Sequence, residues 1–101
     1  MEKQKPHYPL ELVKRLIADM GRDPFTQSAK NGAAEMGLDA DELRGVVAGL
    51  TARDFYKSMT THASHMVWQD MYRPVTRRGA AYVKVTVYPQ ENLIVVSFKE
   101  L

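Results

Sequence analysis

Polar side chains that bind anions or transfer protons recur within one stretch of strand-forming sequence. The segment 54–73, DFYKSMTTHASHMVWQDMYR, places Lys57, Gln69 and Arg73 among bulky apolar residues. Strands of this composition bury one face and leave the other in contact with solvent. An ammonium, an amide and a guanidinium on such a face suit an anionic partner, because charge-assisted hydrogen bonds to phosphate or carboxylate are strong.

A short polar break inside this segment predicts a β-hairpin. A three-residue loop at 62–64 pairs Lys57 with Gln69 across the two strands. The three polar side chains then share the exposed face. The opposite face holds Tyr56 and Trp68, which are expected to pack against the helices.

Two further predicted strands add a phenol and more ammonium groups. Valines at alternate positions before Tyr88 mark a buried face, which leaves Tyr82 and Lys84 on the other face. A short turn after Tyr88 places Tyr82 directly opposite Lys99, with Cβ atoms about 5 Å apart. Whether this face continues the exposed face of the first hairpin depends on strand order, which the sequence leaves open.

Helices are predicted in the first half of the chain and strands in the second. The helices span residues 9–20, 26–36 and 39–50, and the strands span 54–61, 66–73, 80–88 and 93–99. Helices followed by a run of strands with short connections predict an α+β fold with an antiparallel sheet. At 101 residues the chain is predicted to be one domain, helical over 1–50 and a sheet over 51–101.

Local signals predict how the helices end and pack. Asp39 and the glutamate three residues later predict a capping box at the third helix. Met20 completes the apolar stripe of the first helix, and the small residues of the second predict close packing on a neighbour. Gly45 and Gly49 are expected to let the third helix approach the sheet. Residues 1–8 are polar and expected to be loosely held.

Charge is unevenly divided between the two halves of the chain. Residues 1–50 carry seven Lys/Arg and eight Asp/Glu, whereas residues 51–101 carry seven and four. A basic sheet suggests an anionic partner such as nucleic acid. So small an excess is equally typical of ordinary solvated charge.

Composition excludes several kinds of site. The chain has no cysteine, so it has neither disulfides nor thiolate metal ligands. No apolar run reaches the roughly 20 residues of a membrane span, and the N-terminus lacks the apolar core of a signal peptide, so a cytoplasmic protein is expected. His62 and His65 have metal-like spacing but lie in a predicted loop without a third ligand. Neither a metal nor a cofactor is therefore expected.

Several motifs resemble one known family over essentially the whole chain. They are DFYKSMTT at 54–61, VWQDMYRP at 67–74 and LIVVSFKE at 93–100, with MEKQKPHYPLELVK and GLDADELRGVVAGL in the first half. They resemble the motility quorum-sensing regulator (MqsR) toxins. The turn at 89–92 is slightly longer than that family's pattern, and residues 22–30 match it poorly.

The resemblance implies a fold, an activity and two partners. The implied fold is similar to that of the RelE ribonucleases, with N-terminal helices packed on one face of a twisted antiparallel sheet of about four main strands. The implied activity is that of a type II toxin, a growth-inhibiting, metal-independent endoribonuclease that cuts mRNA at GC-containing triplets. The two implied partners are the mRNA substrate and a cognate antitoxin, which binds and neutralises the toxin.

The resemblance also implies which residues form the site. By motif, the catalytic positions fall on Lys57, Gln69, Tyr82 and Lys99. Tyr56, Met59 and Arg73 match residues around that site, and Lys84 joins them as a candidate contact to substrate because it shares the predicted face of Tyr82.

Metal-free RNA cleavage needs a proton acceptor for the 2′-OH, stabilisation of the phosphorane and a proton donor for the leaving 5′ oxygen. Arginine does not lose its proton, so Arg73 is expected to clamp phosphate. Crowded lysines can have a lowered pKa, which makes Lys57 or Tyr82 the expected base. Lys99 is expected to stabilise the phosphorane or act as the acid, and Gln69 to orient the phosphate or a base.

Two other functions are compatible with the same residues. A basic sheet could bind RNA without cleaving it, and the lack of a histidine acid–base pair favours this alternative. An exposed edge strand could instead dock a protein partner. The resemblance favours the ribonuclease.

Overall fold

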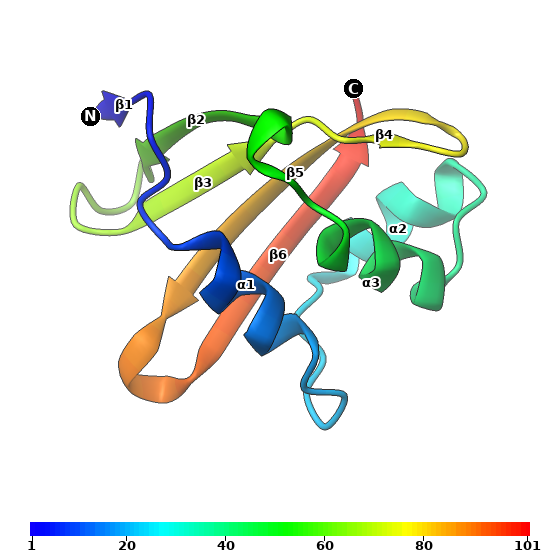
Figure 1. Cartoon of the computed structure of the whole chain (residues 1–101), viewed down its shortest axis with the longest axis horizontal. Helices are drawn as coiled ribbons and strands as arrows, with labels where there is room; N and C mark the ends of the chain where they lie inside the picture. Colours follow the sequence, from blue (N-terminus) through cyan, green and yellow to red (C-terminus); the bar gives the residue numbers. More distant parts are fainter.

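The computed structural model describes residues 1–101, in which three helices precede the main strands of a sheet (Figure 1). The helices are α1 (Leu10–Ile17), α2 (Gln27–Glu35) and α3 (Ala40–Ala48), and the strands are β1 (Glu2–Lys3), β2 (Phe55–Thr60), β3 (Trp68–Tyr72), β4 (Val75–Thr76), β5 (Gly79–Tyr88) and β6 (Leu93–Glu100). Short 3₁₀ turns lie at Ala52–Asp54 and Pro89–Glu91. The α+β prediction and its four main strands are confirmed. The sequence reasoning missed the two-residue strands β1 and β4.

The sheet joins the two predicted hairpins into one surface. Its strand order is β1-β2-β3-β5, and β5 pairs on with β6 and, at its start, with β4. All these pairs are antiparallel. The pairing of β3 with β5, in which Met71 faces Lys84, places the hairpin of Lys57 directly beside the hairpin of Tyr82.

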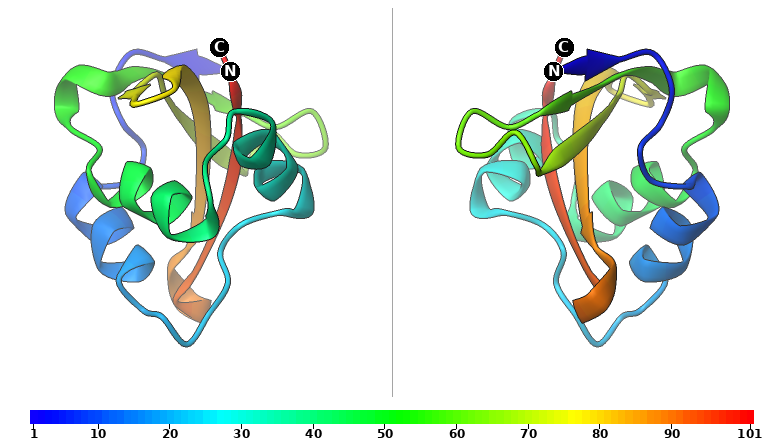
Figure 2. Two further views of the ribbon diagram at one scale, coloured as in Figure 1. Left: turned by 90° about the vertical axis from the view of Figure 1, so that its right-hand side faces the viewer. Right: turned by 90° about the vertical axis from the view of Figure 1, so that its left-hand side faces the viewer.

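The core lies between the sheet and the helices α1 and α3. These two helices lie together on one side of β5 and β6, as Figure 2 shows. The buried strand residues include Val83, Val85 and Val87 of β5, which the alternation predicted, and Ile94, Val96 and Phe98 of β6. Val13 and Ile17 of α1 and Leu43 and Val47 of α3 are buried with them.

Helix starts follow the local capping signals. The Thr26 hydroxyl accepts the N–H of Ala29 at 3.0 Å at the start of α2. At α3, Asp39 accepts the N–H of Glu42 at 2.8 Å, and the Glu42 carboxylate accepts the N–H of Asp39 at 3.1 Å, which confirms the predicted capping box. Such caps stabilise a helix because they satisfy N–H groups that lack an intrahelical partner.

Helix α2 packs on the backbone of the edge strand β6. A Cβ added at Gly32 would overlap the carbonyl oxygen of Phe98, so the two backbones touch here. Just before the helix, Val96 donates to the Pro24 carbonyl at 2.8 Å and accepts the Thr26 N–H at 3.1 Å. The small-residue prediction for this helix is confirmed, and the segment before it covers part of the free edge of β6.

Two other helix predictions are wrong. Met20 is 70% exposed, because α1 ends at Ile17 and the chain turns away before the next apolar position. Gly45 has no atom within 4 Å of an added Cβ, and the nearest atoms to one at Gly49 are carbonyl oxygens of its own helix. Neither glycine of α3 therefore brings the helix closer to the sheet.

The prediction of a loosely held N-terminus is also wrong. The fully buried Asp70 carboxylate accepts the backbone N–H groups of His7 at 2.9 Å and Tyr8 at 2.8 Å. The buried Tyr8 donates its hydroxyl to the Trp68 carbonyl at 2.9 Å, and the Lys3 ammonium lies 4.3 Å from the Trp68 ring centre. These contacts tie residues 3–8 to β3 and so align β1 with the edge of β2.

Replacing Asp70 by asparagine is expected to lower the free energy of unfolding by about 2 kcal/mol. The amide can accept only one of the two backbone N–H groups well, and a hydrogen bond to a charged group contributes about 1.5–3 kcal/mol. Urea unfolding followed by circular dichroism measures the change. Asp41→Asn, at an exposed carboxylate of α3, is the matched control and should stay within about 0.5 kcal/mol of the parent chain. An Asp70→Asn value in that same range would contradict the anchoring role.

Candidate active site

The sheet face turned away from α1 and α3 is called the open face. It carries Tyr56, Lys57 and Met59 of β2, Gln69 and Met71 of β3 with Arg73 just after it, Tyr82 and Lys84 of β5, and Lys99 of β6. Every site residue predicted from the sequence lies on this face. The pairing of β3 with β5 brings them together, since it makes one surface of the two hairpins.

Two aromatic rings lie between two cations in a row across one end of the open face. The Arg73 guanidinium lies 3.8 Å from the centre of the Tyr56 ring. That ring meets Tyr82 edge to face, with centroids 6.2 Å apart. Tyr82 pairs with Lys99 in the register that the sequence predicted, and the Lys99 ammonium lies 5.7 Å from the Tyr82 ring. A row of this kind offers both a positive field and flat surfaces for unpaired bases.

The remaining open-face residues lie in two rows next to this one. Lys57, Met71 and Lys84 face one another across three strands, and Met59 faces Gln69. Met71 receives a hydrogen bond at 3.1 Å from the Tyr82 hydroxyl. Met71 was not among the site residues predicted from the sequence, although its alternation with Gln69 indicated that the two side chains share a face.

The predicted pairing of Lys57 with Gln69 is wrong by two residues. Lys57 pairs with Met71, because the β2–β3 connection is longer than the assumed three-residue loop. The hairpin closes with the Thr61 N–H donating to the Val67 carbonyl at 2.9 Å, and the Thr61 hydroxyl accepts the Ser64 N–H at 3.0 Å inside the loop. A slip of two residues keeps side chains on their face, so both groups stay on the open face.

The predicted placement of Tyr56 on the same face as Trp68 is wrong because β2 is irregular. The register shifts between Phe55 and Lys57, as at a β-bulge. Phe55 consequently packs edge to face on the buried Tyr72, with centroids 5.5 Å apart, and Tyr56 turns to the open face. Bulges redirect side chains in this way. Without the shift, Tyr56 would point toward the helices.

Lys57 has a partner that the sequence reasoning missed. Its ammonium lies 3.1 Å from a carboxylate oxygen of Glu2 on β1, and the two side chains are 22% and 46% exposed. The hydrogen bond that Lys57 donates to Glu2 raises the pKa of Lys57 above its ordinary value, with smaller contributions from Tyr56 and Tyr82. This direction corrects the expectation of a lysine with a lowered pKa. Lys57 is a cation at neutral pH and fits anion binding better than proton abstraction.

The Glu2→Gln variant is expected to return the pKa of Lys57 toward its ordinary value of 10.5. Because the folded state raises this pKa, the ion pair contributes stability below 10.5 and loses it as pH rises through the folded value. An NMR titration of the Lys57 side chain measures the shift. Glu11→Gln, at an exposed position of α1, is the control and should leave the titration unchanged. An equal titration in parent and Glu2→Gln chains would contradict the pairing.

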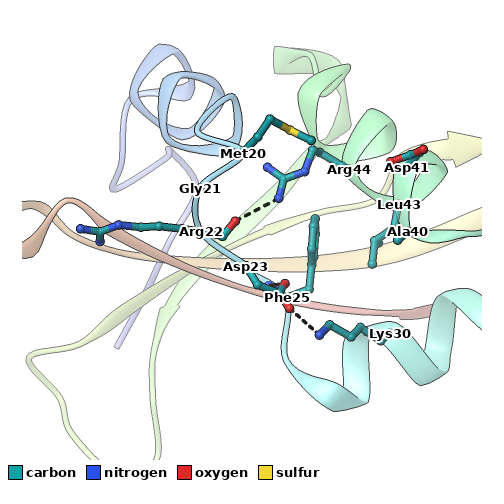
Figure 3. Close-up of a pocket in the computed structure, with 10 residues that line it drawn as sticks. All are labelled: Met20, Gly21, Arg22, Asp23, Phe25, Lys30, Ala40, Asp41, Leu43 and Arg44. Carbon is teal, nitrogen blue, oxygen red and sulfur yellow. Dashed lines mark hydrogen bonds and ion pairs between the residues drawn. The ribbon is translucent and has the colours of Figure 1, made fainter.

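The largest pocket lies away from the open face. It has a volume of about 510 Å³ and lies between the ends of α1, α2 and α3 (Figure 3). Arg44 donates to the Ile17 carbonyl and, at 3.1 Å, to the Arg22 carbonyl, while Lys30 pairs with Asp23. Arg44 and Lys30 therefore bind the segment between α1 and α2. The open-face residues form a surface rather than a pocket, which suits a polymer substrate.

The structure shows neither a cluster of metal-binding side chains nor a membrane-spanning helix. No three His, Cys, Asp or Glu side chains converge as a metal cluster would require, and the pair His62 and His65 lies in the β2–β3 loop. No helix has the length and apolar character to cross a membrane.

Known proteins are similar in sequence to this chain across the elements that build the open face. The family model described as motility quorum-sensing regulator, toxin of MqsA, matches residues 5–100, from the N-terminal segment to the end of β6. The mRNA interferase toxin MqsR of Escherichia coli (strain K12) is 47% identical over 100 residues, which cover 99% of this chain and 99% of that protein. A match of this extent includes all four main strands and the open-face residues from Tyr56 to Lys99. The chain therefore belongs to the family of motility quorum-sensing regulator toxins.

Proposed function

We propose that this chain is a toxin that inhibits growth by cleaving mRNA as a metal-independent endoribonuclease. The observation that carries the proposal is the convergence of Lys57, Gln69, Tyr82 and Lys99 on one open sheet face. A relative named as an mRNA interferase toxin supports the substrate class. Activity on mRNA would place the protein in the cytoplasm.

The proposed reaction is attack of a 2′ oxygen on the neighbouring phosphorus. The P–O5′ bond breaks, which leaves a 2′,3′-cyclic phosphate and a 5′-OH. The ammonium of Lys57 balances charge on the phosphorane, and Lys99 donates a proton to the departing O5′. Gln69 and Lys84 hold the phosphate or a neighbouring base.

The aromatic row supplies the binding surface for the strand. Arg73 contacts the face of Tyr56, so the edge of its guanidinium stays available for a phosphate oxygen. Met59 lies beside Gln69 and offers an apolar surface for an unstacked base. We propose that these contacts select GC-containing sites.

The test is cleavage of a short RNA containing one GC triplet, in the presence of EDTA, with both product ends identified by mass spectrometry. The expected products are the cyclic phosphate and the 5′-OH. A 2′-deoxy substitution at the attacking nucleotide should abolish cleavage, and an RNA without GC should be cut more slowly. Products with a 5′-phosphate, or binding without cleavage, would overturn the mechanism.

The proposed protein partner is a neutralising antitoxin. The family description names its members as toxins of MqsA, which supports a partner of that kind. Co-expression with an MqsA protein should restore growth, and the two proteins should co-purify. Unrelieved growth arrest in that experiment would contradict this pairing.

A further inference from the structure

One acidic side chain lies on the open face, although the sequence placed none there. Glu2 pairs with Met59 in the antiparallel register of β1 and β2, so both side chains lie on the same face. Lys57, two residues from Met59, is its diagonal neighbour and is within reach of a long side chain. The ion pair at 3.1 Å follows from this geometry. The other acidic residues lie on helices, in turns, on the core face or at the end of β6.

The position of Glu2 is held by tertiary contacts. Asp70 binds the backbone of His7 and Tyr8 from the core side of β3, at 2.9 and 2.8 Å. Thr60 donates its N–H to the Met1 carbonyl at 3.0 Å and so secures the start of β1. The carboxylate is therefore fixed beside the site although 55 residues separate it from Lys57.

The ion pair leaves hydrogen-bonding groups free on both partners. One carboxylate oxygen of Glu2 accepts from Lys57, and the side chain is 46% exposed. An ammonium has three N–H donors, so Lys57 can bind a phosphate oxygen without releasing Glu2. An RNA phosphate held by Lys57 would lie beside Glu2, so the 2′-OH of the preceding ribose would be on the same part of the open face as the second carboxylate oxygen.

We propose that Glu2 is the general base of the cleavage reaction, an inference that rests on the proposed function. The Glu2 carboxylate takes the 2′-OH proton as the 2′-O–P bond forms. The P–O5′ bond then breaks, and O5′ takes a proton from the Lys99 ammonium. The carboxylic acid and the neutral amine exchange these protons with water afterwards, so the reaction needs no other reactant.

The competing role for Glu2 is inhibition, in which the carboxylate competes with phosphate for Lys57. The two roles predict opposite effects of Glu2→Gln. Loss of a general base lowers kcat by about 100-fold or more, whereas relief of competition lowers KM and leaves kcat equal or higher.

The experiment measures kcat and KM of the parent, Glu2→Gln and Glu11→Gln chains on the GC-containing RNA. A second substrate carries sulfur in place of the bridging 5′ oxygen, a leaving group that departs without a proton donor. We expect Glu2→Gln to lose about 100-fold or more in kcat on both substrates, whereas Lys99→Met should lose activity on the oxygen substrate and recover on the sulfur one. Thermal unfolding establishes that each variant is folded.

The outcomes separate this inference from the proposed function. A parent chain that cleaves to a cyclic phosphate, together with an equally active or faster Glu2→Gln chain, overturns the role of Glu2 alone. Recovery of Glu2→Gln on the sulfur substrate also overturns it, because that result assigns Glu2 to the leaving group. A parent chain that does not cleave overturns both.

Discussion

Replacement of Lys57 by methionine is expected to lower kcat/KM for RNA cleavage by about 100-fold or more, equivalent to about 2.7 kcal/mol of transition-state stabilisation. Methionine keeps most of the unbranched side chain and removes the charge. The ammonium that balances charge on the phosphorane is lost, and the Glu2 carboxylate, 3.1 Å away in the parent, loses its counter-charge. The measurement is steady-state cleavage of the GC-containing RNA, with RNA affinity measured in parallel.

The matched control for this prediction is Lys30→Met. Lys30 lies on α2 and pairs with Asp23, outside the open face. The Lys30→Met substitution removes the same charge from the chain. It should change kcat/KM by less than about threefold, because exposed charges act on distant sites only through a screened field. Equal losses in the two variants would mean that net charge, rather than the position of Lys57, supports activity.

The Lys57→Met variant also tests whether Lys57 and Glu2 act together. If they form one acid–base unit, the double variant with Glu2→Gln should lose little more activity than either single variant. Independent contributions would instead multiply. A large loss in RNA affinity with unchanged cleavage of bound RNA would make Lys57 a binding residue only.

Replacement of Gly32 by alanine is expected to destabilise the protein by about 3 kcal/mol, although alanine favours helices by about 1 kcal/mol over glycine. The new Cβ would overlap the Phe98 carbonyl oxygen and would lie 3.2 Å from the Lys99 Cα. Both contacts are with backbone, so no side chain can rotate away and α2 must shift from β6. Overpacking of this kind typically costs 1–3 kcal/mol, and a backbone contact is at the upper end.

Gly45→Ala is the matched control and should change stability in the opposite direction. Gly45 is also inside a helix, but no atom lies within 4 Å of an added Cβ. Helix propensity then acts alone, and a gain of about 0.5–1 kcal/mol is expected. Urea unfolding of both variants measures the difference. Equal signs for the two substitutions would contradict the backbone contact between α2 and β6.

The Gly32→Ala substitution is also expected to reduce RNA cleavage. Lys99, whose Cα lies close to Gly32, is an open-face residue of β6. A shift of α2 would disturb β6 at this point, so cleavage should fall together with stability. Gly45→Ala should leave cleavage unchanged.

Features that depend on neighbouring residues could be predicted from the sequence. The pairing of Tyr82 with Lys99 follows from a short turn and strict alternation on both sides of it. The capping box of Asp39 and Glu42 needs only residues three apart. Periodicity likewise located the helices and the four main strands, because side-chain burial repeats within each element.

Features that depend on an irregular loop or strand, or on how separate elements pack together, could not be predicted. The slip of the β2–β3 register arises in a loop closed by its own hydrogen bonds at Thr61 and Ser64. The register shift that turns Tyr56 to the open face has no marker in the alternation of Phe55, Tyr56 and Lys57. Which helical glycine meets a backbone also depends on how helices and sheet pack, which is why Gly32 rather than Gly45 does so.

The sequence by itself determined that Lys57 shares a face with Gln69 and that Tyr82 pairs with Lys99 in the last hairpin. It did so because the two-residue period and the short turn are local properties of the chain. Only the tertiary structure decided that β3 lies beside β5, which makes one site of two hairpins. It alone also placed Glu2 beside Lys57, because a two-residue strand is positioned by the buried Asp70 rather than by any pattern of its own.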